Sequence, residues 1–178
     1  MRAMVCFGVV LTMGAGMCVG AAAAAPQEGV RRIGVYDSRA VAVAWVGSPA
    51  FEAAMKPLHD DLANAEAAGD ARRVEEVKAE GEARQRQLHM QCFSTAPVDN
   101  ILDLIKESLP AIRHQAGVEV LISKWDRKAL AKQPGAERID VTMALVDALQ
   151  PNEKQRRYAT EVQQHKPIPL WLARHLKD

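Results

Sequence analysis

Apolar positions in the second half of the chain follow a strand pattern first and a helix pattern afterwards. The run from Val118 to Ser123 is rich in Val, Leu and Ile and predicts a strand. After a polar segment, the stretch from Arg138 to Leu149 places apolar residues at helical spacing. This pattern predicts a helix that begins at Asp140 or Thr142 and ends before Pro151.

The first half of the chain begins with a short apolar run from Arg32 to Ser38, which predicts a first strand. The residues from Arg39 to Val46 are apolar at most positions and include three alanines, which favours a buried helical segment. Gly47 then breaks the pattern. Ser48 is expected to cap a new helix whose first residue is Pro49.

The segment from Phe51 to Phe93 consists mainly of Ala, Glu, Lys, Arg and Gln, with one interruption at Gly69 and Asp70. We expect Gly69 to end one helix and Asp70 to cap a second helix that runs back antiparallel to it. Pro57 is expected to kink the first of the two helices. Because apolar positions are few, the pair is predicted to project as a mostly solvated hairpin.

The next helix is predicted to follow Thr95, a natural cap. Apolar residues then recur every three or four positions from Val98 to Ile112, which predicts one amphipathic helix ended by Gly117. A further strand is predicted near 127–131, paired as a β-hairpin with the strand from Val118 to Ser123.

Together these elements predict an α+β fold, a small β-sheet body with a projecting antiparallel helical hairpin.

Residues 1–25 resemble a signal peptide because Arg2 is their only charge and an apolar stretch and several alanines follow it. A membrane anchor is the alternative. Residues 26–150 are expected to form the folded domain, with the hairpin at 51–93, and 151–178 a C-terminal extension.

Charge and cysteine content narrow the classes of function. Without Arg2 the chain keeps 22 of its 23 basic residues against 22 acidic ones, so the expected mature protein is neutral. A general nucleic-acid-binding protein needs a basic surface, which argues against that class. Cys92 is the only cysteine after residue 25, and its apolar neighbours predict a buried side chain rather than an intermolecular disulfide.

The sequence carries no recognisable catalytic, cofactor-binding or metal-binding motif. None of its five histidines lies three or four residues from another, the spacing that would place two metal ligands on one helical face. The serines lack the glycines of a nucleophile elbow. We therefore expect a binding protein that uses neither nucleotide nor metal, not an enzyme.

The order of the elements resembles the Skp/OmpH family of periplasmic chaperones. The resemblance rests on the early strand with Asp37-Ser38, the helical hairpin, the strand from Val118 to Ser123, and the Asp140-x-Thr142 start of the last helix. It implies an exported homotrimer in which strands of three chains form a body and helical hairpins surround unfolded outer-membrane proteins. The hairpin predicted here is shorter than the family's, and the chain is less basic.

The resemblance also assigns residues to roles. It implies that Asp140 and Thr142 cap a helix and take no part in chemistry. Five apolar residues would build the body of the trimer: Ile33, Val35, Val118, Val120 and Ile122.

Three functions follow as expectations. The first is an ATP-independent holdase that acts in outer-membrane biogenesis and binds unfolded envelope proteins in the periplasm. The second is an envelope structural or adaptor protein that keeps only the trimeric body. The third is weak membrane-surface contact through a tail interface made by Leu170, Trp171 and Leu176, although we expect this tail to dock onto its own domain.

Overall fold

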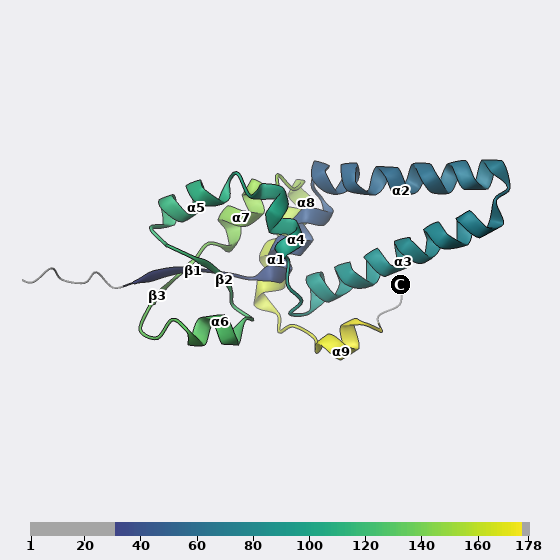
Figure 1. The fold of residues 1–178 in the computed structure, drawn as a ribbon. Coiled ribbons are helices and arrows are strands. Elements are labelled where there is room, and N and C mark those ends of the chain that lie inside the picture. The colour runs from purple at the N-terminus through teal and green to yellow at the C-terminus, as the bar shows by residue number, and fades with distance from the viewer. Residues whose placement is uncertain (1–30, 176–178) are drawn as a thin grey trace, which may run out of the picture.

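The computed structural model describes residues 31–175 (Figure 1). The predicted signal peptide and Leu176 lie outside the described residues. Within the described part of the chain, no helix is both long enough and apolar enough to cross a membrane.

Three short strands form a parallel sheet in the order β2-β1-β3. The central strand β1 is Arg32–Tyr36, β2 is Leu121–Ser123 and β3 is Glu137–Asp140. Gly34 lies opposite Leu121 on one side and Ile139 on the other. A Cβ on Gly34 would lie 2.7 Å from Cδ2 of Leu121, so the close packing of β1 and β2 here needs a glycine.

The predicted fold class, a small sheet body with a projecting antiparallel helical hairpin, is wrong. The structure is 66% helical around a three-stranded parallel sheet. Residues 127–131 form helix α6 (Arg127–Ala131), because the Asp126 carboxylate accepts a hydrogen bond from the Ala129 amide and starts a helical turn. The β-hairpin predicted for β2 therefore does not form.

Helix α1 (Ser38–Val46) follows β1 directly and is buried along most of its length. It packs against α3, α7 and α8, which explains why apolar residues and alanines occupy nearly all of its positions. Asp37 caps this helix by accepting a hydrogen bond from the Arg39 amide at 3.0 Å.

Two long helices, α2 (Pro49–Ala68) and α3 (Ala71–Phe93), form an arm that projects from the side of α1 and α8 opposite the sheet (Figure 1). Ser48 caps α2, Gly69 ends it in the left-handed conformation at φ 69°, and Asp70 caps α3. Pro57 lies inside α2 without ending it. The base of α3 packs against α1 and α9, so these helices are part of the body and not an appended hairpin.

The predicted helix from Val98 to Ile112 is divided into α4 (Asp99–Leu102), the 3₁₀ turn η1 (Asp103–Ile105) and α5 (Leu109–Ala116). Pro110 has no amide hydrogen to continue a helix from the preceding turn, so the chain restarts there. The apolar stripe still faces the core, where Ile101, Ile105 and Ile112 are buried.

Thr95 does not cap α4, which begins after Val98 without a side-chain cap. At the other end of the segment, Gly117 ends α5 at φ 62°.

The chain closes with α7 (Thr142–Ala148), α8 (Glu153–Glu161), the 3₁₀ turn η2 (Val162–Gln164) and α9 (Leu170–Ala173). Helix α8 packs along α1, so residues after 150 belong to the same body.

A strap of residues 165–173 follows η2 and crosses to the base of α3. It is held by hydrogen bonds from the Ile168 amide to the Phe93 carbonyl at 3.0 Å and from Ser94 Oγ to the Ile168 carbonyl at 2.7 Å.

Candidate functional site

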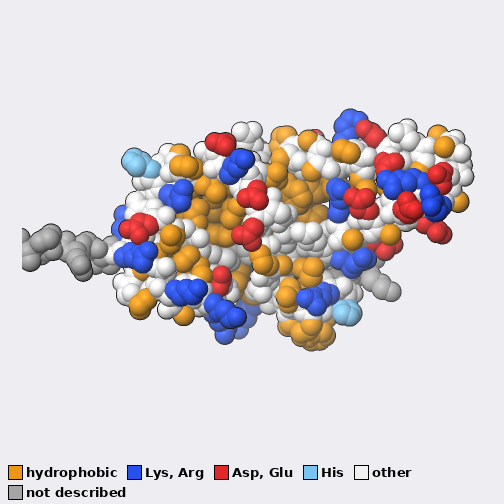
Figure 2. Space-filling view, viewed as in Figure 1, with side chains coloured by type: hydrophobic (Ala, Val, Ile, Leu, Met, Phe, Trp, Pro, Cys, Tyr) orange, Lys and Arg blue, Asp and Glu red, His pale blue; other side chains and the backbone are white. Residues whose placement is uncertain are grey.

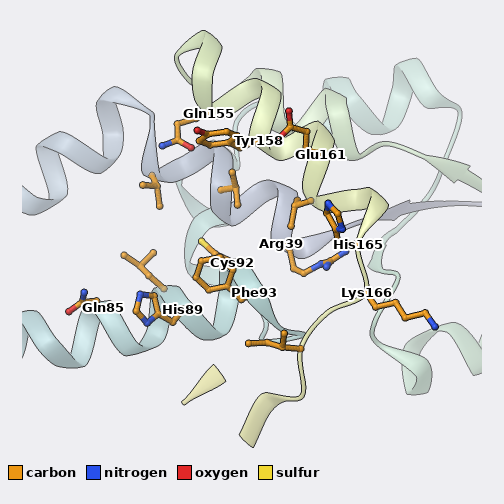
Figure 3. Close-up of a pocket in the computed structure, with 15 residues that line it drawn as sticks. Arg39, Gln85, His89, Cys92, Phe93, Gln155, Tyr158, Glu161, His165 and Lys166 are labelled. Carbon is orange, nitrogen blue, oxygen red and sulfur yellow. The ribbon is translucent and has the colours of Figure 1, made fainter. Parts of the chain in front are cut away.

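A cavity of about 700 Å³ lies where the arm joins the body (Figure 3). Its walls come from α1, the last turns of α3, α8 with η2, and the strap. Each wall comes from a different part of the sequence, and the volume is within the range of small-ligand sites.

The middle of the pocket is apolar. Val43 and Val46 line it from α1, and Leu88, Cys92 and Phe93 line it from α3. Helix α1 contacts both α3 and α8, so these residues line a pocket that the other two helices also bound. Such a wall binds apolar groups by removing their surface from water.

One end of the pocket is polar and carries both signs of charge. Figure 3 shows Arg39 and His165 together there, with Glu161 nearby on α8, while the side chain of Lys166 extends away from the pocket. His165 and Lys166 belong to the strap, so the strap contributes residues to this end.

The position of Arg39 is fixed by a buried carboxylate at the end of β1. Asp37 is fully buried, and it accepts hydrogen bonds from Arg39 Nε at 3.1 Å and Nη2 at 2.8 Å. Lys124 Nζ lies 2.6 Å from Asp37 Oδ2, and Trp125 Nε1 donates to Oδ1 at 3.1 Å. The Arg39 guanidinium also lies over the Trp125 ring, 5.0 Å from its centroid.

These contacts, which we call the Asp37 cluster, set the charge of the carboxylate. Burial by itself would raise the pKa of Asp37, but the hydrogen bonds from Arg39, Lys124 and Trp125 outweigh it and hold the pKa below its ordinary value. Asp37 is therefore ionised at neutral pH, and both its oxygens are occupied. Its role is to hold Arg39 at the pocket.

The two residues of the Asp-x-Thr motif have separate roles. Asp140 Oδ1 accepts a hydrogen bond from the Thr142 amide at 2.8 Å, at the start of α7. The Thr142 hydroxyl does not cap α7. It accepts a hydrogen bond from the Asp37 amide at 3.0 Å, which ties α7 to the end of β1.

The five residues expected to build a trimer body lie in or beside the sheet of a single chain. Ile33, Val118 and Ile122 are buried there, and Val35 and Val120 are half-buried. Val118 and Val120 precede β2, which is shorter than predicted. These side chains are thus used in packing within one chain.

Two of the three tail interface residues lie in the strap, on α9. Leu170 is half-buried and Trp171 is 68% exposed, while Leu176 lies outside the described residues. Both described residues belong to α9, which packs against α3. Figure 2 shows apolar side chains gathered over α9 and charges of both signs at the far end of the arm.

Burial governs the chemistry of Cys92. It raises the pKa of the thiol to about 12, so the thiol stays protonated at neutral pH. We expect iodoacetamide at pH 8 to alkylate Cys92 slowly in the native protein and quickly in denaturant. The rate is followed by mass spectrometry of the peptide containing Cys92.

The same pKa shift makes stability depend on pH. In the unfolded chain the thiol ionises near its ordinary pKa, whereas the folded thiol holds its proton to about pH 12. The contribution of Cys92 to stability is therefore present at lower pH and is lost as the pH rises through this interval.

The alkylation experiment has its own contradicting outcome. If iodoacetamide alkylated Cys92 equally fast in the native and the denatured protein, the thiol would not be buried.

Sequence reasoning did not identify the pocket residues Arg39, Tyr158, His165 and Lys166. One signal was present, because Arg39 is the only charged residue in α1 and follows Asp37 by two positions. The other residues sit in polar stretches that carry no motif. No group of three or more His, Cys, Asp or Glu side chains suited to a metal ion is found among residues 31–175.

Comparison with family models, with curated proteins and with solved structures finds no match to this chain, so the resemblance to Skp/OmpH has no independent support.

Proposed function

We propose that this protein is a holdase that binds apolar segments of unfolded polypeptides at the pocket and at the exposed side chains beside it. One observation carries the proposal. In the described part of the chain five large hydrophobic side chains are exposed; two of them line the pocket, and two more lie on α9, which follows the pocket residue Ile168 and contacts α3. Phe93 and Tyr158 line the pocket, and Trp171 and Leu172 lie on α9 against α3.

Such a surface suits a client without a fixed structure. Apolar contacts are not directional, so different sequences can be held by the same wall. A contiguous exposed apolar patch on a soluble protein marks an interaction site more often than isolated apolar side chains do.

The proposal places client binding at the base of the arm and not along it. The far part of the arm is covered by exposed ion pairs, among them Arg72 with Glu76 and Lys78 with Glu66. A polar surface of this kind offers an unfolded chain little apolar area. In this proposal the protein is exported and holds unfolded envelope proteins in the periplasm, without nucleotide.

The adaptor alternative depends on a body built from strands of three chains. Pairing of β1 with both β2 and β3 inside one chain gives no support to that arrangement. The homotrimer therefore stays a prediction, to be tested by measuring the oligomeric state, and the proposal does not depend on it.

The test is the aggregation of a denatured outer-membrane β-barrel protein diluted into buffer with the purified protein. The combined change Phe93→Ser and Trp171→Ser removes two of these exposed apolar side chains, one in the pocket wall and one on α9. We expect it to raise the concentration needed for half-suppression about tenfold. Light scattering gives the mass of the free protein and of any client complex.

The matched control is Leu104→Ser. Leu104 is 52% exposed, comparable to Phe93 at 47%, but it does not line the pocket. Suppression should be unchanged in this variant. If the wild-type protein leaves aggregation unchanged, or if both variants lose activity equally, the proposed function is wrong.

A further inference from the structure

Helix α9 presents an exposed tryptophan on a segment that is firmly attached to the body. Trp171 is 68% exposed, more than any other large hydrophobic side chain in the described part of the chain, and Leu172 beside it is 39% exposed. Ala173 of the same helix is buried, and the strap is hydrogen-bonded to Phe93 and Ser94. Because α9 is already held in place, contact of its exposed side chains with a partner costs little conformational entropy.

The chain around α9 carries positive charge only. Residues 162–175 include Lys166 and Arg174 but no aspartate or glutamate. Both cations are exposed, and neither forms an ion pair with another described residue. Figure 3 shows the Lys166 side chain extending away from the pocket, so its charge is available at the outer surface.

Helix α6 adds a second group of cations on the same edge of the molecule. Residues 127–132 contain three exposed basic side chains and no acidic one. In Figure 1, α6 and α9 both lie along the lower edge, and Figure 2 shows Lys and Arg side chains over α6 and apolar side chains over α9. One flat surface can therefore meet both helices at once. We call this surface the α6–α9 edge, and it consists of Arg127, Lys128, Lys132, Lys166, Trp171, Leu172 and Arg174.

An anionic lipid bilayer fits both parts of this edge. Tryptophan is favoured at the level of the lipid head groups, where its ring is partly removed from water. Each Lys or Arg close to an anionic bilayer adds electrostatic attraction. The whole chain has a formal net charge of only +1, so five cations without acidic neighbours are a local excess. A nucleic acid would attract these cations but offers little apolar surface to Leu172.

We propose that the α6–α9 edge docks on the surface of an anionic phospholipid bilayer. Trp171 and Leu172 enter the head-group region, and the five cations face the lipid phosphates. This contact goes beyond the proposed holdase function and does not depend on it, because Phe93 and Tyr158 in the pocket wall are not part of the edge.

The test is co-sedimentation of the full-length protein with vesicles at low salt. One set is an equal mixture of phosphatidylglycerol and phosphatidylcholine, and the other is phosphatidylcholine alone. We expect at least about tenfold tighter binding to the anionic set. No binding to the anionic set, or equal binding to both sets, overturns the proposal.

A single-stranded oligonucleotide at the same phosphate concentration separates a lipid surface from a nucleic acid. It should bind at least about tenfold more weakly than the anionic vesicles, because it gives Trp171 and Leu172 no head-group layer to enter. Equal or tighter binding of the oligonucleotide overturns the proposal in favour of a nucleic-acid surface.

Charge reversal on α6 tests whether this edge makes the contact. Lys128→Glu should weaken binding to the anionic vesicles about tenfold. The matched control is Lys106→Glu, which reverses an exposed lysine between η1 and α5, and α5 lies at the opposite edge in Figure 1. Residues 1–30 are the same in both variants, so a difference between them comes from the edge. Equal weakening by the two variants overturns the assignment.

Quenching of tryptophan fluorescence by lipids with brominated acyl chains locates the apolar contact. Residues 1–30 contain no tryptophan, and the other two tryptophans are Trp45 and Trp125. Brominated anionic vesicles should quench the wild-type protein, whereas Trp171→Phe should bind the same vesicles with little quenching. Equal quenching of the two proteins, or none in the wild type, overturns the entry of Trp171 into the bilayer.

Two variants separate this proposal from the holdase function. Lys128→Glu should leave the suppression of aggregation unchanged, and Phe93→Ser should leave vesicle binding unchanged. The vesicle experiments contain no polypeptide client, so their failure leaves the holdase proposal standing. A failed aggregation assay likewise leaves the lipid contact standing.

Discussion

Asp37→Asn is expected to destabilise the protein by about 3–5 kcal/mol, the usual cost of removing one partner from a buried ion pair. The asparagine keeps the size of the side chain but removes its charge. Arg39, whose side chain is 2% exposed, and Lys124 would then lose their shared counter-ion. Urea unfolding followed by circular dichroism measures the loss.

The control for this change is Asp147→Asn. Asp147 forms a two-point contact with Arg156, at 2.7 Å to Nε and 3.2 Å to Nη2, but both side chains are about half exposed. Its loss should cost less than about 1 kcal/mol. Equal losses in the two variants would show that the Asp37 cluster does not stabilise the fold.

The pH dependence of the Asp37 variant has a definite sign. The pKa of Asp37 is lowered in the folded protein, so its contribution to stability is present above the ordinary pKa and is lost as the pH falls. Asp37→Asn should remove this part of the acid sensitivity. The unfolding free energy of the variant should approach that of the wild type in acid. If the difference between the two proteins were the same at all pH values, the lowered pKa of Asp37 would be contradicted.

Ile101→Ala is expected to cost about 2–5 kcal/mol, because it leaves a cavity in the core. Ile101 is fully buried in α4, and neighbouring core residues such as Leu145 are fully buried as well. The unfolding free energy in urea and the melting temperature should fall together.

Leu104→Ala, three residues later in η1, provides the comparison. Leu104 is 52% exposed, so its truncation should change stability by no more than about 0.5 kcal/mol. The contrast tests the packing of this divided segment. A large loss from Leu104→Ala, or a small one from Ile101→Ala, would show that the segment packs in a different register.

Local signals in the sequence predicted the ends of several helices. Ser48 with Pro49, Gly69 with Asp70, and Gly117 act through hydrogen bonds and backbone angles within a few residues. Such signals can be recognised without knowing what the helix packs against.

The sheet could not be predicted in the same way. Three of the four β3 residues are exposed, so the strand has no apolar pattern, and it pairs with a strand far away in the sequence. The position of α6 depends on Asp126 as a cap, which a reading based on hydrophobicity overlooks. The fold class was wrong for these reasons.

The pocket depends even more on tertiary structure. Its walls come from residues between Arg39 and Ile168, and no window of the sequence contains them together. The sequence predicted that α1 is helical. It did not predict that one face of α1 would line a pocket between α3 and α8. The only local signal was the pair Asp37 and Arg39, two positions apart, which places charged side chains at the start of an apolar helix.

The central place of β1 has a consequence for how the chain folds. During synthesis β1 emerges early, yet its partners begin only at Leu121 and Glu137, so the strand has no neighbour to pair with until most of the protein has been made. The arm, whose contacts are local, can form in the meantime. Loop-closure entropy makes such distant pairing slow, and the sheet with its Asp37 cluster should therefore be among the last parts to assemble.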